Sequence, residues 1–121
     1  MEDEESKSSF LEAMGDSPIN RVVDFLITYD EFDYSLTDIA ENAGVGYSTL
    51  MLFWSKLEEK KIVKFTRKVG KAKMYQLNKS NPAVKILVQF WLQIAKEEVH
   101  RLLEEPAGLI NSSIVAPMAV E

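Results

Sequence analysis

Apolar residues recur every three or four positions in four stretches of the chain, which is the spacing of amphipathic helices. The pattern predicts helices over 17–29, 35–43, 46–60 and 82–105. A shorter apolar stretch at 10–14, interrupted by Gly15, is expected to add one turn upstream. Between the third and fourth helices the pattern changes to alternation, which predicts a β-hairpin over 62–78 around Gly70. The predicted fold class is therefore α+β and mostly helical, with one hairpin and a long C-terminal helix.

Local signals place the ends of these elements. Ser17 and Ser35 are expected to cap the first two helices, and Asp38 completes a capping box at the second. Gly44 supplies the left-handed conformation that ends a helix tightly. Pro106 is predicted to end the last helix at residue 105. The chain is thus divided into a disordered acidic tail over 1–9, one domain over 10–105, and a tail over 106–121 that shows no clear period.

The charge is distributed unevenly along the chain. The net charge is −5, which by itself argues against binding to phosphates. Residues 1–36, however, hold ten acids and two bases, whereas residues 37–80 hold nine bases and four acids. A local basic surface decides binding more than the total charge does. The middle of the chain is therefore the region where an anionic partner is expected.

Several classes of protein are not expected from this composition. There is no cysteine, so a disulfide framework, a thiolate metal site and a cysteine nucleophile are excluded. No apolar run approaches the length of a membrane span, and the acidic start differs from a signal peptide, so we expect a cytoplasmic protein. His100 stands alone among glutamates, and no catalytic or nucleotide-binding motif occurs. We expect no enzyme, no catalytic residues, no metal and no cofactor.

The segment 38–50, DIAENAGVGYSTL, continued by KLEEKKIV at 56–63, resembles the winged helix-turn-helix motif of MarR- and ArsR-type regulators of archaea and bacteria. The resemblance is ungapped, is moderately specific and extends over about 18–105. It implies a double-stranded DNA-binding transcriptional regulator in which 46–60 is the recognition helix and 62–78 is the wing. The chain departs from the family at Gly46, where a serine cap is usual. The first two turns of the recognition helix also lack Arg, Lys, Asn and Gln, the residues that read bases most directly.

Candidate DNA contacts follow from this resemblance. The apolar positions Ile39, Ala40, Val45, Leu50 and Leu57 are expected to form core, so contacts belong to the outward side chains of the recognition helix and to the basic tip of the wing. The predicted contacts are Tyr47, Ser48, Thr49, Met51, Leu52, Ser55 and Lys56 on the helix, and Arg67, Lys68, Lys71 and Lys73 on the wing.

Two alternatives to duplex binding remain open. The outward face of the recognition helix is unusually apolar, so the domain is alternatively a protein-interaction module of a transcription or chromosome complex, contacting its partner through this helix or the C-terminal tail. Binding of RNA or single-stranded DNA requires exposed aromatic residues on a basic sheet, and only Phe65 and Tyr75 qualify.

The last helix carries more apolar surface than one small domain requires. A heptad-like stripe lies beside a second stripe formed by Leu87, Trp91 and Ile94. One stripe can pack on the helix over 17–29 and the other on a second copy, which predicts a homodimer, with the 17–29 helix also taking part. The predicted dimer interface comprises Val88, Trp91, Leu92, Ala95, Val99 and Leu102. The alternative is that the whole surface folds back into the monomer.

Overall fold

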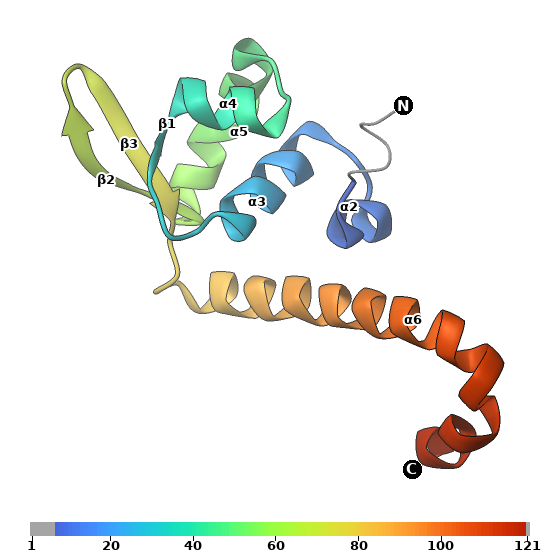
Figure 1. The fold of residues 1–121 in the computed structure, drawn as a ribbon. Helices are drawn as coiled ribbons and strands as arrows, with labels where there is room; N and C mark the ends of the chain where they lie inside the picture. Colours follow the sequence, from blue (N-terminus) through green and yellow to red (C-terminus); the bar gives the residue numbers. More distant parts are fainter. Residues whose placement is uncertain (1–6, 121) are drawn as a thin grey trace.

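The computed structural model describes the backbone of residues 7–120 and the side chains of residues 7–104. Among the described residues, four helices and three short strands form a head, and a fifth, long helix lies beneath it (Figure 1). The predicted fold class, mostly α with a small antiparallel sheet and a long C-terminal helix, is confirmed. In chain order the elements are α2 (Ser9–Met14), α3 (Pro18–Thr28), β1 (Tyr34–Ser35), α4 (Leu36–Ala43), α5 (Tyr47–Glu59), β2 (Val63–Val69), β3 (Ala72–Leu77) and α6 (Pro82–Val120).

The head is held together by one apolar core between α3, α4, α5 and the sheet. Burying such side chains is the main favourable term in folding, at about 1.5–3 kcal/mol for each large aliphatic residue. The spacing of apolar residues on α5 explains its orientation, because the positions three and four apart face inward while those between them face solvent. The largest fully buried side chains are Val22, Leu26, Ile39, Leu50, Leu77 and Val84.

Serine side chains cap three of the helices. Ser17 and Ser35 accept hydrogen bonds from the backbone N–H groups of Asn20 and Asp38, at 3.2 and 3.1 Å. Ser8 caps α2 in the same way, accepting from Leu11 N at 3.1 Å. The predicted tail over 1–9 lies mostly outside the described residues, but its last part is wrong, because Ser8 and Ser9 cap and open a helix.

The sheet has the strand order β1-β3-β2, with both pairs antiparallel. The sequence did not predict β1, which is only two residues long and exists because Tyr34 pairs with Tyr75 and Ser35 with Met74. The pairing of β2 with β3 is interrupted by a β-bulge, since Phe65 pairs with Tyr75 whereas Arg67 pairs with Met74. Thr66 is therefore the extra residue on β2.

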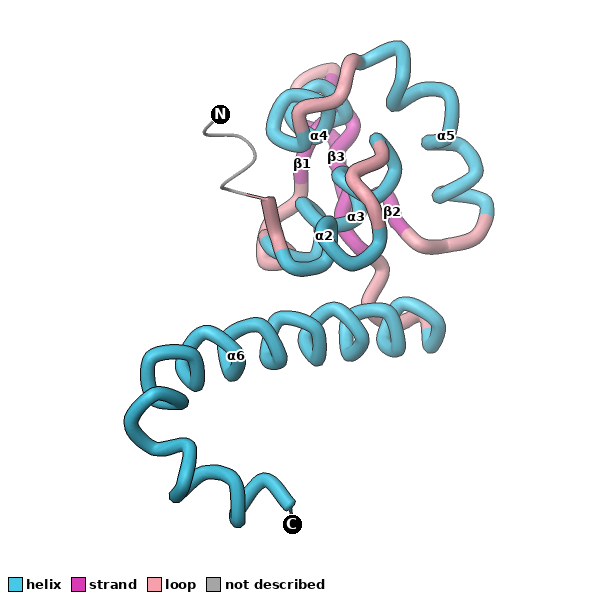
Figure 2. The backbone as a smooth tube through the Cα atoms, turned by 90° about the vertical axis from the view of Figure 1, so that its right-hand side faces the viewer, coloured by secondary structure: helices cyan, strands magenta, loops and turns pink. Residues whose placement is uncertain are grey.

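Helix α6 runs along the base of the head, past α3 and α2 (Figures 1 and 2). It is anchored at its start, where the Asn81 side-chain amide donates to the Lys61 carbonyl at 2.9 Å. Further along, Trp91 Nε1 donates to Asp24 Oδ1 of α3 at 2.8 Å, and the same oxygen accepts from Ser8 Oγ at 3.0 Å. One carboxylate thus joins α6 to α3 and to the start of α2.

Helix α6 does not end at residue 105, as the sequence predicts, but continues to Val120. A proline inside a helix removes one backbone hydrogen bond and crowds the preceding turn, which bends a helix without necessarily ending it. The last part of α6, red in Figure 1, turns away from the axis of the first part. In the part of the chain that the structure describes, no helix has the length and apolar character needed to cross a bilayer.

Candidate nucleic-acid interface

The turn between α4 and α5 fixes where α5 begins. Gly44 adopts φ 70° and ψ 36°, a left-handed conformation that glycine tolerates better than other residues. The turn is closed by backbone hydrogen bonds from Val45 N to Ala40 O at 2.8 Å and from Gly44 N to Glu41 O at 3.2 Å. Two short helices are thereby joined at a fixed angle, as in a helix-turn-helix unit.

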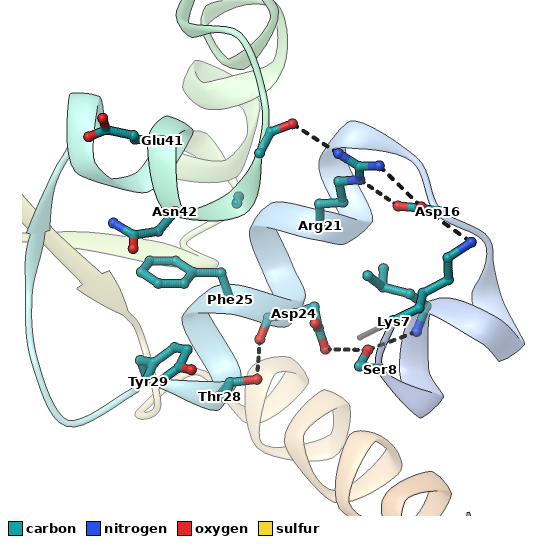
Figure 3. A pocket seen from close by; sticks show the side chains of 13 residues that line it. Lys7, Ser8, Asp16, Arg21, Asp24, Phe25, Thr28, Tyr29, Glu41 and Asn42 are labelled. Carbon is teal, nitrogen blue, oxygen red and sulfur yellow. Dashed lines mark hydrogen bonds and ion pairs between the residues drawn. The ribbon is translucent and has the colours of Figure 1, made fainter. Parts of the chain in front are cut away.

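Arg21 braces this turn from α3. Its Nη1 donates to the carbonyl oxygen of Gly44 at 2.9 Å, while its Nε and Nη2 donate to the carboxylate of Asp16 (Figure 3). The Arg21 guanidinium lowers the pKa of Asp16 below its ordinary value of 3.8, with a smaller contribution from Lys7. These residues border an open polar hollow of about 800 Å³ between α2, α3 and α4. Lys7 and Arg21 both pair with Asp16 there, so we interpret the hollow as part of this brace.

The predicted contacts on α5 form its solvent-facing surface. Tyr47, Ser48, Met51, Leu52, Ser55 and Lys56 are all exposed, and Thr49 is half-buried. Leu52 is 83% exposed, which is the highest exposed fraction among the large apolar side chains of the described residues. The core-facing side of the same helix holds Leu50, Trp54 and Leu57. The helix therefore presents a full face of side chains that has no role in the packing of the head.

The N-terminus of α5 is left open. Gly46, which occupies the N-cap position, makes no side-chain hydrogen bond to the first turn. Backbone N–H groups at the start of a helix that lack such a cap point outward and favour negatively charged groups. The departure from the family motif at Gly46 thus leaves these donors open to solvent or to a ligand.

The wing is a hairpin with a two-residue turn, Gly70–Lys71. Gly70 has φ 63°, and a glycine with positive φ at the first turn position is typical of type II′ hairpins. Lys68 lies directly opposite Lys73 across the two strands. Side chains two residues apart on a strand share a face, so this lysine pair shares the face of Tyr75, which packs edge-on against Trp54 of α5 at 5.2 Å.

Arg67 lies on the other face of the hairpin. Its Nε and Nη2 donate to the two carboxylate oxygens of Asp33 at 2.9 and 3.1 Å. Arg67, followed by Thr66, lowers the pKa of Asp33 from 3.8 to about 2. The four predicted wing cations are therefore not one group. Lys68, Lys71 and Lys73 have no ion-pair partner among the described residues, whereas Arg67 is held by a carboxylate.

The base of the wing carries an acid. Burial, followed by the neighbouring Glu58 and Tyr47 of α5, raises the pKa of Tyr75. Glu58 thus lies at the inner end of the hairpin while the lysines lie toward its tip. On the hairpin face that packs against α5, Glu58 is therefore near the base and the lysine pair is toward the tip.

The predicted dimer residues of α6 fall into two groups. Val88 and Trp91 pack against the core of their own domain, and Ala95 is half-buried. Leu92, Val99 and Leu102 are between 48% and 55% exposed. On the other flank of α6 lies an apolar hollow of about 530 Å³, shared with α2 and α3 and lined mainly by Phe10, Met14, Ile19, Val23, Ile86 and Phe90. The long helix therefore carries unpaired apolar surface on both sides of its buried stripe.

No metal centre is found among the described residues, since no three His, Cys, Asp or Glu side chains gather there. His100 lies on the surface of α6 with its Nε2 3.2 Å from Glu104 Oε2.

The sequence did not predict the roles of Arg21, Asp33 and Thr66. Their partners lie 23, 34 and 33 residues away, and nothing in the local pattern marks such pairs.

Solved structures with a similar fold include two regulators of transcription. MepR, a transcription regulator of the Staphylococcus aureus multidrug efflux pump MepA, is 17% identical, with 82% of this chain and 74% of that chain covered and a TM-score of 0.55. The transcriptional regulator PA3341 is 20% identical, with 90% and 82% covered and a TM-score of 0.55. A double mutant of Lactococcus lactis ZitR is 13% identical, with 82% and 71% covered and a TM-score of 0.53.

No protein-family model matches the chain, and no curated protein matches it significantly. At identities of 20% and below, the likeness to the solved structures concerns the fold. It confirms at that level the resemblance inferred from the sequence. The chain has a winged helix-turn-helix fold, similar to the folds of MepR and PA3341.

Proposed function

We propose that this protein is a transcriptional regulator that binds double-stranded DNA as a homodimer, with α5 in the major groove and the wing on the phosphate backbone. The observation that carries the proposal is the lysine pair Lys68 and Lys73, which face each other across the hairpin. Like charges directly opposite each other destabilise a sheet by themselves. An anion placed between or beside them removes that cost, and DNA supplies such anions in a row.

The position of the pair supports a shared surface with α5. Both lysines lie on the hairpin face that packs against this helix, and Lys71 extends the charge to the tip. On α5, we propose that Tyr47 and Ser48 contact phosphates, together with Ser55 and Lys56 further along. Met51 and Leu52 are suited to thymine methyl groups, with Thr49 beside them. We infer that base reading is largely through shape and apolar contact. A cytoplasmic location follows from this role in a bacterial or archaeal cell.

The homodimer is proposed to form through the exposed stripe of α6, with Leu92, Val99 and Leu102 at its centre. The apolar hollow beside α3 provides a second surface for the partner copy. A two-fold dimer would present two α5 helices and two wings to a palindromic site. The structural neighbours MepR and PA3341, which are named as transcription regulators, make such a role the expected one for this fold.

The test is duplex binding as a function of salt for the wild type and for the triple variant Lys68→Ala, Lys71→Ala, Lys73→Ala. The logarithm of the binding constant should fall with the logarithm of salt concentration, with a slope of about −0.9 for each phosphate contact. The triple variant should lose about 0.9 from that slope for each lysine that contacts a phosphate. The matched control is Lys85→Ala with Lys96→Ala, which removes exposed lysines of α6. Absence of binding at low salt, or equal slopes for wild type and triple variant, would contradict the proposal.

A protein-interaction module is the second candidate, and the observation that favours it is the exposure of Leu52, Met51 and Tyr47 on one helix face. The variant Leu52→Lys separates the two. On a DNA-facing surface the new cation should tighten duplex binding, whereas on a protein-facing surface it should abolish capture of the partner. A pull-down that depends on these three residues, without any duplex binding at low salt, would favour the second candidate.

A further inference from the structure

The β-bulge at Thr66 decides which cations of the wing face α5. Strand β3 alternates regularly, so Tyr75 and Lys73 face α5 while Met74 faces away. On β2, Phe65 pairs with Tyr75, but the next paired residue is Arg67, opposite Met74. The bulge therefore turns Arg67 to the outer face and Lys68 to the α5 side.

A hairpin without this bulge would give the opposite result. Thr66 would pair with Met74 and Arg67 with Lys73, and the extra residue would move into the turn. A shift of one residue in a strand moves every following side chain to the other face. Arg67 would then face α5, as simple alternation of the sequence predicts, and Lys68 would face away.

The bulge is held by Asp33. This residue precedes β1, which pairs with β3 and not with β2. Its carboxylate nevertheless reaches across β3 to accept two hydrogen bonds from Arg67 and one from the hydroxyl of Thr66. The Thr66 hydroxyl also lies 3.2 Å from the Met74 carbonyl oxygen. Asp33 thus contacts the extra residue and the residue after it, and its side chain is only 14% exposed.

We propose that Asp33 is the positioning residue of the wing: it holds the extra residue of β2 at Thr66 and so directs Lys68, and not Arg67, toward the α5 side. The positioning role of Asp33 is argued from the strand pairing and from the contacts of its carboxylate, and its consequence for DNA rests on the proposed function. Arg67 then serves as a clamp on the outer face and makes no phosphate contact.

The experiment measures cross-strand nuclear Overhauser effects in the DNA-free protein, for the wild type and Asp33→Ala. In the wild type, contacts should connect residues 68 and 73. In Asp33→Ala these contacts should be lost or reduced at least twofold, with contacts between 67 and 73 replacing them where the shifted register forms. Contacts between 34 and 75 report whether the rest of the sheet is intact. Wild-type intensities between 68 and 73 in Asp33→Ala would overturn the proposal.

Two further variants keep the result interpretable. Asp30→Ala is the matched control, because Asp30 lies in the same loop and pairs with Lys79 at 3.1 Å, away from the bulge. It should leave the 68–73 contacts unchanged. If Asp33→Ala does not fold, Asp33→Asn keeps the shape of the side chain and removes the charge, and the same comparison applies.

Duplex binding gives a second and separate measurement. Lys68→Ala should weaken binding severalfold in the wild-type background and have little effect in the Asp33→Ala background, because Lys68 has then left the DNA-facing side. An equal effect in both backgrounds would contradict the positioning role. If no duplex is bound at all, the proposed function fails while the register measurement still decides the role of Asp33.

Discussion

At the scale of single residues, the Asp33–Arg67 ion pair links the residue before β1 to β2. Both carboxylate oxygens are used, which gives a bidentate geometry, and Thr66 adds a third donor. The pair is partly open to solvent because Arg67 is exposed, so its net contribution to stability is limited by screening. Its effect is therefore better detected through its pH dependence than through a single stability value.

The pKa of Asp33 gives the direction of that dependence. It is lowered from 3.8 to about 2 in the folded protein, so the charged form is favoured by folding. The stabilisation is complete above the ordinary value and is lost as the pH falls through the folded value. We expect Asp33→Asn to lower Tm near neutral pH, with the difference from wild type shrinking between about pH 4 and pH 2. Thermal unfolding followed by circular dichroism at several pH values measures this, and a constant difference over that range would refute it.

At the scale of elements, the two glycines of the turn between α4 and α5 have different backbone conformations. Gly44 is left-handed, and a Cβ there would lie 3.2 Å from Arg21 Nη1. Gly46 has φ −63° and ψ 147°, an ordinary conformation, and a Cβ there would meet only Thr49 Oγ1 at 3.7 Å. The first glycine is required by the backbone, whereas the second occupies a position that a serine cap fits.

Two substitutions should therefore have opposite signs. Gly44→Ala should lower the free energy of unfolding by about 1–2 kcal/mol because of the left-handed backbone, and the crowding of Arg21 adds to this. Gly46→Ser should raise it by a few tenths of a kcal/mol by supplying the missing cap, roughly the difference between these two residues at an N-cap. Urea denaturation of both variants gives the comparison. A stabilising Gly44→Ala would show that the turn does not need glycine.

The helix-turn-helix and its caps could be predicted from the sequence because their signals are local. Ser35 and Gly44 lie within ten residues of each other and act on the backbone next to them. Strand β1 depends on pairing with a strand some forty residues away. The bulge at Thr66 lies within the hairpin, but its contact with Asp33 joins residues 33 positions apart, and no local pattern indicates either one. The identity of the wing cations was predicted, but not which of them an acid already holds.

At the scale of the whole molecule, the long helix determines how two copies would meet. Val88 and Trp91 are turned toward their own core, so a dimer contact on this flank would use Leu92, Val99 and Leu102. These residues repeat at the spacing of a helix–helix seam. A charge in the centre of such a seam would be buried without a partner on association.

We expect the double variant Leu92→Glu, Val99→Glu to be a monomer with an unchanged fold. Sedimentation equilibrium gives the mass, and circular dichroism checks the helix content. Gln89→Glu is the control, because Gln89 is an exposed polar residue on the same helix. This variant should keep the measured mass of a dimer. Equal masses for wild type and the double variant would contradict the proposed contact through this face of α6.

The two tryptophans of the chain have very different surroundings. The Trp54 indole is buried in the head, and its N–H has no acceptor among the described residues. The Trp91 indole lies where α6 meets α3 and α2, hydrogen-bonded to a carboxylate that also binds Ser8. One fluorophore therefore reports on the integrity of the head and the other on whether the long helix stays seated beneath it. The fluorescence of Trp91 therefore reports on movement of the long helix relative to the head. In a Trp54→Phe variant, Trp91 would be the source of the remaining tryptophan signal.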